Sequence, residues 1–256
     1  MPRLVLLFFL LTGLLSGCAD DSELASPESG DELVVVTRNT PTTYYFEGDR
    51  ASGFDYALIR QFAREHNLSL RIKVAFSLPE VFDMIASGQA HLAAAGLSQS
   101  AERDARFLAS EPYLEQQPLV VYKSGAQRPK TLRDLVDRDI VIVAGSVHAQ
   151  LLMRLREDYP ELSWREVHAA DSLELMQLIT EEKAELAVVD SIEFSVQQPL
   201  FPRVVAAMEI GTPSPIVWYL PQSNTATQFL ETVNGFITDA GESGFIAQLR
   251  RQHFGR

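Results

Sequence analysis

Residues 77–98 of the chain read SLPEVFDMIASGQAHLAAAGLS, and this stretch decides the fold class. Its first four residues place a serine three positions before a glutamate, the pattern of a helix start with a capping box. Apolar residues then recur at helical spacing until Gly88, a typical helix end. The alanine-rich run from Ala90 to Ala95 follows as a short buried strand, leading into Gly96. A helix followed directly by a strand predicts an α/β unit.

The same pattern occurs again in residues 171–191, DSLELMQLITEEKAELAVVDS. Glu80 aligns with Glu174 without gaps, an offset of 94 residues. Upstream, the apolar runs 33–36 and 140–143 also correspond. Because any two helix–strand units share part of this pattern, a chance likeness stays open as the alternative. If the repeat is real, the body consists of two α/β lobes of similar design. Ligands of open α/β sheets bind beyond the carboxyl ends of strands, so the segments after these strands are expected to face a shared cleft.

The amino terminus carries one positive charge, Arg3, before the largely apolar run Leu4–Leu15. This run is too short to cross about 30 Å of hydrocarbon as a helix. It has the dimensions of a signal-peptide apolar region. It ends in Leu15-Ser16-Gly17-Cys18, which resembles a lipobox. We therefore expect a lipoprotein signal over residues 1–17 and acylation of Cys18, with an ordinary secretory signal as the alternative.

Cys18 is the only cysteine of the chain, so no disulfide can form within it and no cysteine is left for catalysis or a metal. The acidic segment that follows, ADDSELASPESGD, contains almost no apolar residues. Residues 18–31 are therefore expected to be a lipidated cysteine with a flexible tether. Ala19 directly after the cysteine resembles the outer-membrane sorting pattern. We expect a periplasm-facing lipoprotein of the outer membrane, with the inner membrane as the alternative.

Composition argues against several classes of function. The chain has 34 acidic and 22 basic residues, a formal net charge of −12, which repels phosphate backbones and argues against nucleic-acid binding. The five histidines show no short metal-ligand spacing. The sequence contains neither a phosphate-binding glycine loop nor a Gly-x-Ser-x-Gly motif. We therefore expect no enzymatic activity, no metal and no cofactor.

Three short motifs lie at or beside the expected cleft: Gly53-Phe54-Asp55-Tyr56, then Ala95-Gly96-Leu97-Ser98 followed by Glu102-Arg103, and Ala187-Val188-Val189-Asp190. In this order and spacing they resemble bacterial solute-binding proteins of family 3, the periplasmic amino-acid receptors. The resemblance covers residues 32–256. It implies a type II periplasmic-binding-protein fold of two lobes joined by two hinge crossovers, near residues 116–121 and 211–215. Its expected bounds are 32–117 and 215–256 for the first lobe and 118–214 for the second.

Four further segments carry a narrower likeness: 41–45 (PTTYY), 94–103 (AAGLSQSAER), 128–132 (RPKTL) and 160–164 (PELSW). They resemble the amino-terminal, non-catalytic domain of membrane-bound lytic murein transglycosylase F. The last two are not general features of family 3. Such transglycosylases use a Glu-Ser pair on a separate helical domain. The pair Glu242-Ser243 instead falls in what resembles the closing helix of a binding protein, so no catalysis is expected from it. The binding half of a truncated transglycosylase stays an alternative.

The resemblance implies a set of ligand contacts. Arg103 matches the arginine that grips a ligand carboxylate, which a planar guanidinium can bind through both oxygens. Asp190, from the other lobe, matches the acid that meets the ligand's ammonium group. The remaining contacts are Ser98 and Gly96 beside Arg103, Tyr44 or Tyr45 over the ligand's apolar part, Ser146 as a polar contact, and His148 as a further candidate. The alternatives are an exposed arginine in a polar turn for Arg103 and a helix cap for Asp190.

An arginine and an aspartate on opposite lobes suit a zwitterion that draws the lobes together. We therefore expect a lipid-anchored binding protein that closes on an amino acid or a muropeptide beside the membrane or the cell wall. Val147 stands where amino-acid receptors often carry a hydroxyl, which leaves specificity for a free amino acid open. The alternative function is a receptor that delivers solute to the permease of an amino-acid ABC importer.

Overall fold

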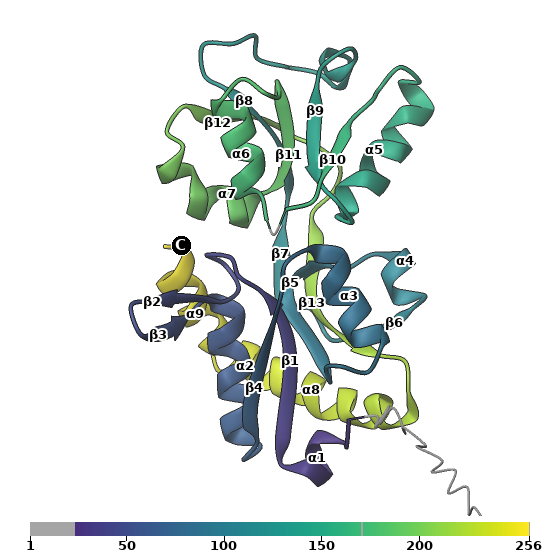
Figure 1. Cartoon of the computed structure of the whole chain (residues 1–256), viewed down its shortest axis with the longest axis vertical. Helices are drawn as coiled ribbons and strands as arrows, with labels where there is room; N and C mark the ends of the chain where they lie inside the picture. The colour runs from purple at the N-terminus through teal and green to yellow at the C-terminus, as the bar shows by residue number, and fades with distance from the viewer. Residues whose placement is uncertain (1–23, 170, 256) are drawn as a thin grey trace, which may run out of the picture.

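The computed structural model describes residues 24–169 and 171–255. The expected signal peptide, Cys18 and the first part of the expected tether lie outside these ranges. The described chain forms two α/β lobes stacked along the long axis of the molecule (Figure 1). The last helix ends beside the boundary between them (Figure 1). This arrangement confirms the predicted α/β fold class with two lobes.

The first lobe is built on a sheet of strand order β4-β1-β5-β13-β6, to which β7 adds by pairing with β13. Its strands are β1 (Glu32–Arg38), β4 (Ser69–Ala75), β5 (Leu92–Ser98), β6 (Phe107–Ala109), β7 (Leu114–Gln116) and β13 (Ser214–Pro221). A separate hairpin consists of β2 (Tyr45–Glu47) and β3 (Arg50–Ser52). The helices are α1 (Pro27–Gly30), α2 (Phe54–Glu65), α3 (Leu78–Ala86), α4 (Ala101–Asp104), α8 (Asn224–Glu242) and α9 (Phe245–Phe254).

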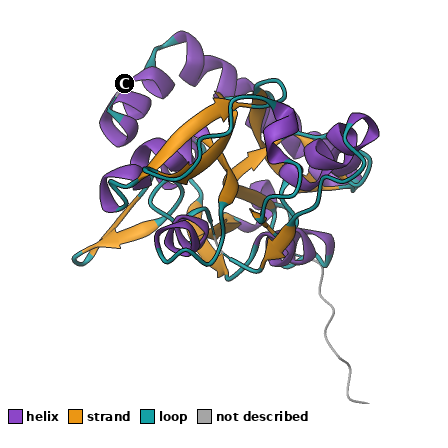
Figure 2. Ribbon diagram, turned by 90° about the horizontal axis from the view of Figure 1, so that it is seen from above, coloured by secondary structure: helices purple, strands orange, loops and turns teal. Residues whose placement is uncertain are grey.

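The second lobe is built on a sheet of strand order β10-β9-β11-β8-β12. Its strands are β8 (Pro118–Lys123), β9 (Ile140–Val143), β10 (Arg165–Val167), β11 (Leu186–Asp190) and β12 (Val204–Glu209). The helices are α5 (Val147–Asp158), α6 (Leu173–Thr180) and α7 (Ser191–Gln197), with the short 3-10 helices η1 (Leu132–Leu135) and η2 (Gln198–Leu200). Seen from above, most helices lie around the central strands (Figure 2).

The two sheets share one topology. β4-β1-β5 are parallel neighbours in the first lobe, and β10-β9-β11 are parallel neighbours in the second. In each sheet an antiparallel strand follows next, β13 beside β5 and β8 beside β11. Residues 77–98 and 171–191 contain the corresponding units α3-β5 and α6-β11. The predicted repeat is therefore a repeat of structure.

The first strand shows why the sheets are covered on both faces. Side chains alternate across a strand, so an uninterrupted apolar run such as that in β1 has two faces to bury. Val34 and Val36 belong to the core on the α3 side, whereas Leu33 and Val35 pack with the side chains of α2, α8 and α9. Both faces of the sheet are thus apolar core.

Two local predictions, the helix cap and the start of the strand that follows, can be compared with the structure. The Ser77 hydroxyl accepts a hydrogen bond from the Glu80 backbone N–H at 3.4 Å, so the predicted helix cap is confirmed. In the second copy the cap is made by Asp171, whose Oδ1 accepts from the Leu173 backbone N–H at 2.9 Å. Strand β5 begins two residues later than expected and runs through Gly96 to Ser98.

The chain passes between the lobes twice, from β7 to β8 through Gln117 and from β12 to β13 through residues 210–213. The Gln117 side chain donates to the Ile210 carbonyl at 3.0 Å, which ties one crossover to the other. Its backbone N–H donates to the Ser191 hydroxyl at 3.0 Å, at the start of α7. The hinge region is therefore hydrogen-bonded to the helix that follows Asp190.

Residues 24–31 differ from the expectation of a flexible tether. Leu24 packs against the core of the first lobe, and α1 follows it. The His91 Nδ1 accepts from the Val34 backbone N–H at 3.0 Å, and its Nε2 donates to the Ala25 carbonyl at 2.9 Å. Leu24, one of the few apolar residues of the acidic segment, thus lets this part bind to the lobe.

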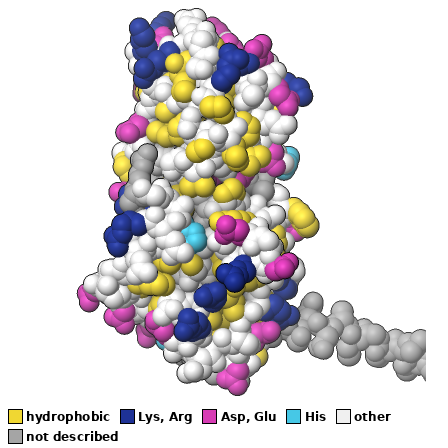
Figure 3. Space-filling model, turned by 90° about the vertical axis from the view of Figure 1, so that its left-hand side faces the viewer, with side chains coloured by type: hydrophobic (Ala, Val, Ile, Leu, Met, Phe, Trp, Pro, Cys, Tyr) yellow, Lys and Arg dark blue, Asp and Glu magenta, His cyan; other side chains and the backbone are white. Residues whose placement is uncertain are grey.

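No helix within residues 24–169 and 171–255 is long and apolar enough to cross a membrane. On the face in Figure 3, acidic and basic side chains are interspersed, and hydrophobic side chains gather over the upper lobe.

Candidate functional site

A cavity of about 370 Å³, measured up to its open mouth, lies between the lobes. We call it the first cavity. The first lobe contributes Arg38, Leu78, Gly96, Leu97, Ser98 and Arg103, and the second contributes Val143, Ser146, Val147, His148, Ser172, Asp190 and Glu193. The structure thus brings together five of the seven predicted contacts: Gly96, Ser98, Arg103, Ser146 and Asp190. The candidate His148 lies among them.

Arg103 lies on α4 and lines the first cavity. The Ser100 hydroxyl caps this helix. The Arg103 side chain is buried, which rules out the alternative of an exposed arginine. Its guanidinium lies 4.7 Å from the centre of the Phe82 ring and donates to the Ser98 carbonyl at 2.5 Å. A second bond at 3.0 Å reaches the Gly145 carbonyl on the other lobe. These two bonds leave further N–H donors of the guanidinium for a ligand carboxylate.

Burial lowers the pKa of Arg103 to about 10. The guanidinium therefore keeps its charge at neutral pH. A charged, planar donor held against an aromatic ring is suited to bind a carboxylate through two parallel hydrogen bonds.

Asp190 ends β11 and precedes α7, which places it on the second lobe at the cavity. It occupies the cap position of α7, but its side chain makes no capping hydrogen bond. Its Oδ1 lies 3.2 Å from Nε2 of His148, a residue that is buried. A ligand ammonium group would therefore share this carboxylate with the imidazole.

An ion pair between the lobes, Arg38 with Glu193, was not predicted. Arg38 Nη2 lies 3.0 Å from Glu193 Oε1, and the two side chains are 5% and 8% exposed. Arg38 also donates to the Ala95 carbonyl through Nε at 3.0 Å and Nη2 at 2.8 Å. Glu193 Oε2 accepts from the backbone N–H and the hydroxyl of Ser172. The sequence signals were a charged residue at the end of an apolar strand and an acid one helical turn after Asp190.

Gly96 owes its position to the Gly53–Tyr56 motif. The backbone of Gly96 has φ +62°, a conformation that favours glycine. Its N–H donates to Asp55 Oδ2 at 2.6 Å, and the Tyr113 hydroxyl donates to Asp55 Oδ1 at 2.7 Å. Burial raises the pKa of Asp55 to about 6. The aspartate of the motif thus shapes the strand that carries Gly96.

Ser98 is held beside Arg103 by a buried side chain from β7. Its hydroxyl oxygen accepts from Gln116 Nε2 at 2.7 Å, so its O–H is oriented to donate elsewhere. Ser146, at the start of α5, has a buried hydroxyl with no hydrogen-bond partner among the described residues. Both hydroxyls can therefore serve a polar ligand.

Tyr44 and Tyr45 are not brought to the first cavity, contrary to expectation. Tyr44 packs edge-to-face against Phe46 and Tyr56, with ring centres 5.5 and 5.4 Å apart. The Tyr45 hydroxyl accepts from Ser52 across the β2–β3 hairpin at 3.3 Å. The physical reason is the turn before them, in which the Thr43 hydroxyl donates to the Arg38 carbonyl and the chain leaves the cleft.

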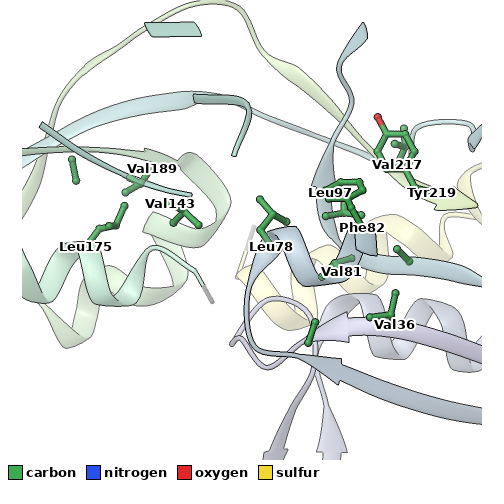
Figure 4. Packing of buried hydrophobic residues seen from close by; sticks show 14 of the residues in the cluster. Val36, Leu78, Val81, Phe82, Leu97, Val143, Leu175, Val189, Val217 and Tyr219 are labelled. Carbon is green, nitrogen blue, oxygen red and sulfur yellow. The ribbon is translucent and has the colours of Figure 1, made fainter. Parts of the chain in front are cut away.

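The apolar wall of the first cavity comes instead from Leu78 and from the valines of the second lobe. Leu78, at the first position of α3, lies between Val143, Leu175 and Val189 on one side and the core of the first lobe on the other (Figure 4). It is 5% exposed. Leu78 is therefore an interlobe contact as well as a cavity residue.

The structure also shows where the acidic and histidine side chains and Glu242 lie. Within residues 24–169 and 171–255, no group of three or more His, Cys, Asp and Glu side chains is placed to hold a metal. Glu242 lies at the exposed end of α8 and does not line the first cavity.

Known proteins with similar sequences and folds agree with this architecture. Membrane-bound lytic murein transglycosylase F from Saccharophagus degradans is 29% identical over 255 residues, which is 100% of this chain and 51% of that protein. The chain spans about half the length of the curated relatives it matches.

Two solved structures share the fold. The GluR0 ligand-binding core from Nostoc punctiforme in complex with L-glutamate has a TM-score of 0.75 at 23% identity, covering 88% of this chain and 100% of that one. An ancestral arginine-binding protein bound to arginine has a TM-score of 0.78 at 20% identity, covering 88% and 98%. The family model of bacterial extracellular solute-binding proteins, family 3, matches residues 33–256. The chain therefore belongs to the family 3 solute-binding proteins.

Proposed function

We propose that this protein binds a small zwitterion, an amino acid or a muropeptide, between its lobes, and that it does so in the bacterial cell envelope. The observation that carries the proposal is the placement of Arg103 and Asp190 on opposite walls of one cavity. A carboxylate at Arg103 and an ammonium group at Asp190 would join the two lobes through the ligand. Each charge-assisted hydrogen bond contributes about 1.5–3 kcal/mol. This is enough to shift an open–closed equilibrium of a few kcal/mol.

The comparisons support the class of ligand. The GluR0 core binds L-glutamate and the ancestral protein binds arginine, both in the same fold. Several relatives with similar sequences are named as murein transglycosylases, which makes a peptidoglycan fragment a natural second candidate. In that case the protein acts as a sensing or regulatory module beside the cell wall.

An acylated Cys18 would hold this module at the membrane, and the outer membrane is our proposed location. Multiple acyl chains hold a protein on a bilayer more firmly than one chain does. Leu24 and Ala25 contact the first lobe, so only a short segment would separate the anchor from the folded body. Mass spectrometry of the mature protein would test the acylation, and membrane fractionation would test the location. Recovery in the inner membrane would instead favour an ABC importer receptor.

The binding proposal is tested by a thermal-shift screen of the purified chain against amino acids and muropeptides. A ligand at one hundred times its Kd stabilises the folded state by about 2.7 kcal/mol. The Arg103→Ala variant should lose this shift. Arg106→Ala is the matched control, because Arg106 is an exposed arginine on the adjacent turn that also lies over a phenylalanine ring. Binding by the chain that survives Arg103→Ala unchanged would refute the assignment, as would a screen without any hit.

A further inference from the structure

A second cavity of about 280 Å³ lies between the lobes and adjoins the first. Its wall is mostly apolar and comes from Phe54, Tyr113, Leu114, Ile216 and Phe254 of the first lobe and Ile192 of the second. Gly96 and Glu193 line both cavities. The two spaces are therefore neighbours that share part of one wall.

The Arg38–Glu193 ion pair stands at this shared wall. Arg38 is fixed from the first lobe by two bonds to the Ala95 carbonyl, and Glu193 is fixed from the second lobe by the Ser172 backbone and hydroxyl. Gly96 has no side chain, and a Cβ built there would lie 3.4 Å from Arg38 Nη2. Glu193 and Gly96 line both cavities and Arg38 lines the first, so the ion pair and Gly96 together form the shared wall.

The free energy needed to separate Arg38 from Glu193 makes the ion pair a fixed barrier and not one that a ligand opens easily. Removing one partner from a buried ion pair leaves an uncompensated charge in the interior, which costs more than the burial of one apolar side chain contributes. An apolar tail alone would therefore not part Arg38 from Glu193. Because Arg38 and Glu193 neutralise each other, Arg103 and Asp190 remain to bind the two charged ends of a ligand.

The linings lead to the same conclusion. The first cavity presents charged and hydroxyl-bearing side chains from both lobes, whereas the wall of the second cavity is mostly apolar. A ligand that occupied both cavities would carry a charged amino-acid head and a long apolar extension.

We propose that the Arg38–Glu193 ion pair determines ligand length: it restricts the cleft to compact zwitterions and closes off an apolar cavity that would otherwise admit a long side chain. The proposal rests on the proposed function and specifies the ligand class of that site. Arg38 and Glu193 are on this view specificity-determining residues.

The test is a length series with one constant head group, L-norleucine and L-2-aminodecanoic acid, titrated into the purified chain by calorimetry. The wild-type chain should prefer the shorter ligand by at least tenfold in Kd. The double variant Arg38→Ala/Glu193→Ala removes both charges of the ion pair together. It should shift the preference toward the longer ligand by at least tenfold. Adding Ile192→Trp to the double variant, to fill the second cavity, should reduce this gain.

The outcomes separate the two proposals. Binding of norleucine by the wild type with an unchanged length preference in the double variant would overturn the role of the ion pair and leave the binding function standing. A wild-type chain that binds neither member of the series, nor any other zwitterion, overturns both. Circular dichroism checks that the double variant is folded. If it is not, Glu193→Gln weakens the pair with little change of shape and should shift the preference at least threefold in the same direction.

Discussion

Gly145 offers the sharpest test of lobe closure, because the effect of a substitution there on closure can be separated from its effect on the stability of the fold. It lies on the second lobe after β9, with φ +73°. A Cβ at this position would lie 3.0 Å from Cγ and 3.3 Å from Cδ of Pro79, a ring on the first lobe. The Gly145 carbonyl also accepts the bond from Arg103. A Gly145→Ala side chain would therefore press the lobes apart where they are joined.

Two contributions set the expected magnitude. A non-glycine residue in the left-handed region costs roughly 1–2 kcal/mol, and this cost applies whether the lobes are open or closed. The contact with Pro79 and the loss of the Arg103 bond act on the closed form alone. A hydrogen bond to a charged group is worth about 1.5–3 kcal/mol. Since about 1.4 kcal/mol corresponds to a factor of ten, the closed form and the affinity for the ligand should fall by about tenfold or more.

Gly88→Ala is the matched control. Gly88 also has a positive φ, +68°, but a Cβ there meets no atom within 4 Å. Both variants should lose a similar amount of stability in urea denaturation, whereas only Gly145→Ala should lose affinity in calorimetry and show a larger radius of gyration in small-angle X-ray scattering. Equal affinities and equal radii for the two variants would refute the view that closure brings Gly145 against Pro79.

Two further predictions concern the buried carboxylates. Asp55→Ala removes the acceptor of the Gly96 N–H and the Tyr113 O–H. Each buried donor left without a partner costs about 1–3 kcal/mol, so urea denaturation should show a loss of about 2–6 kcal/mol for the two donors. An unchanged midpoint would contradict the role given to Asp55. Burial, followed by the nearby Glu193, raises the pKa of Asp171 to about 7. Between pH 4 and pH 7 the Asp171 carboxyl is therefore protonated in the folded state, whereas in the unfolded state, with the ordinary pKa of 3.8, it has lost its proton. The free energy of unfolding therefore falls as the pH rises from about 4 to 7, by at most about 1.4 kcal/mol per pH unit. Asp171→Asn should flatten this slope in denaturation curves between pH 4 and 8, and a slope equal to that of the wild type would assign the proton to another group.

Periodicity predicted the elements of the fold well because each is stabilised by local contacts and by the packing of its apolar residues in a hydrophobic core. The run 140–143 is strand β9 with the same bounds, and Ser77 caps α3 as expected. Gly96 was expected after the strand but lies within β5, because its N–H is held by the Asp55 carboxylate, a contact 41 residues away that no local pattern reveals. The expected tether did not include the packing of Leu24 against a buried cluster whose residues come from other parts of the chain.

In the site too, the position of some residues is determined by a single chain segment, and that of others by the contact between the two lobes. The resemblance to family 3 implied Arg103 and Asp190, and both line the first cavity because each follows a strand whose carboxyl end faces the cleft. The pairing of Arg38 with Glu193 depends on how the lobes approach each other, which local sequence does not determine. Tyr44 was misplaced because a turn of hydrogen-bonded threonines directs it toward Tyr56.

The repeat explains why the charges of the cleft come from opposite lobes at all. Two sheets of one topology, joined at a pair of adjacent crossovers, turn the carboxyl ends of their parallel strands toward each other. Any polar residue placed after β1 or β5 then faces a residue placed after β9 or β11. Opposite charges at such positions either bind each other, as Arg38 and Glu193 do, or stay available to a ligand that carries both signs, as we propose for Arg103 and Asp190. The charges that already pair within the protein need no ligand, so the charges that remain determine the charge of the ligand. Here one positive and one negative side chain remain, which suits one zwitterion.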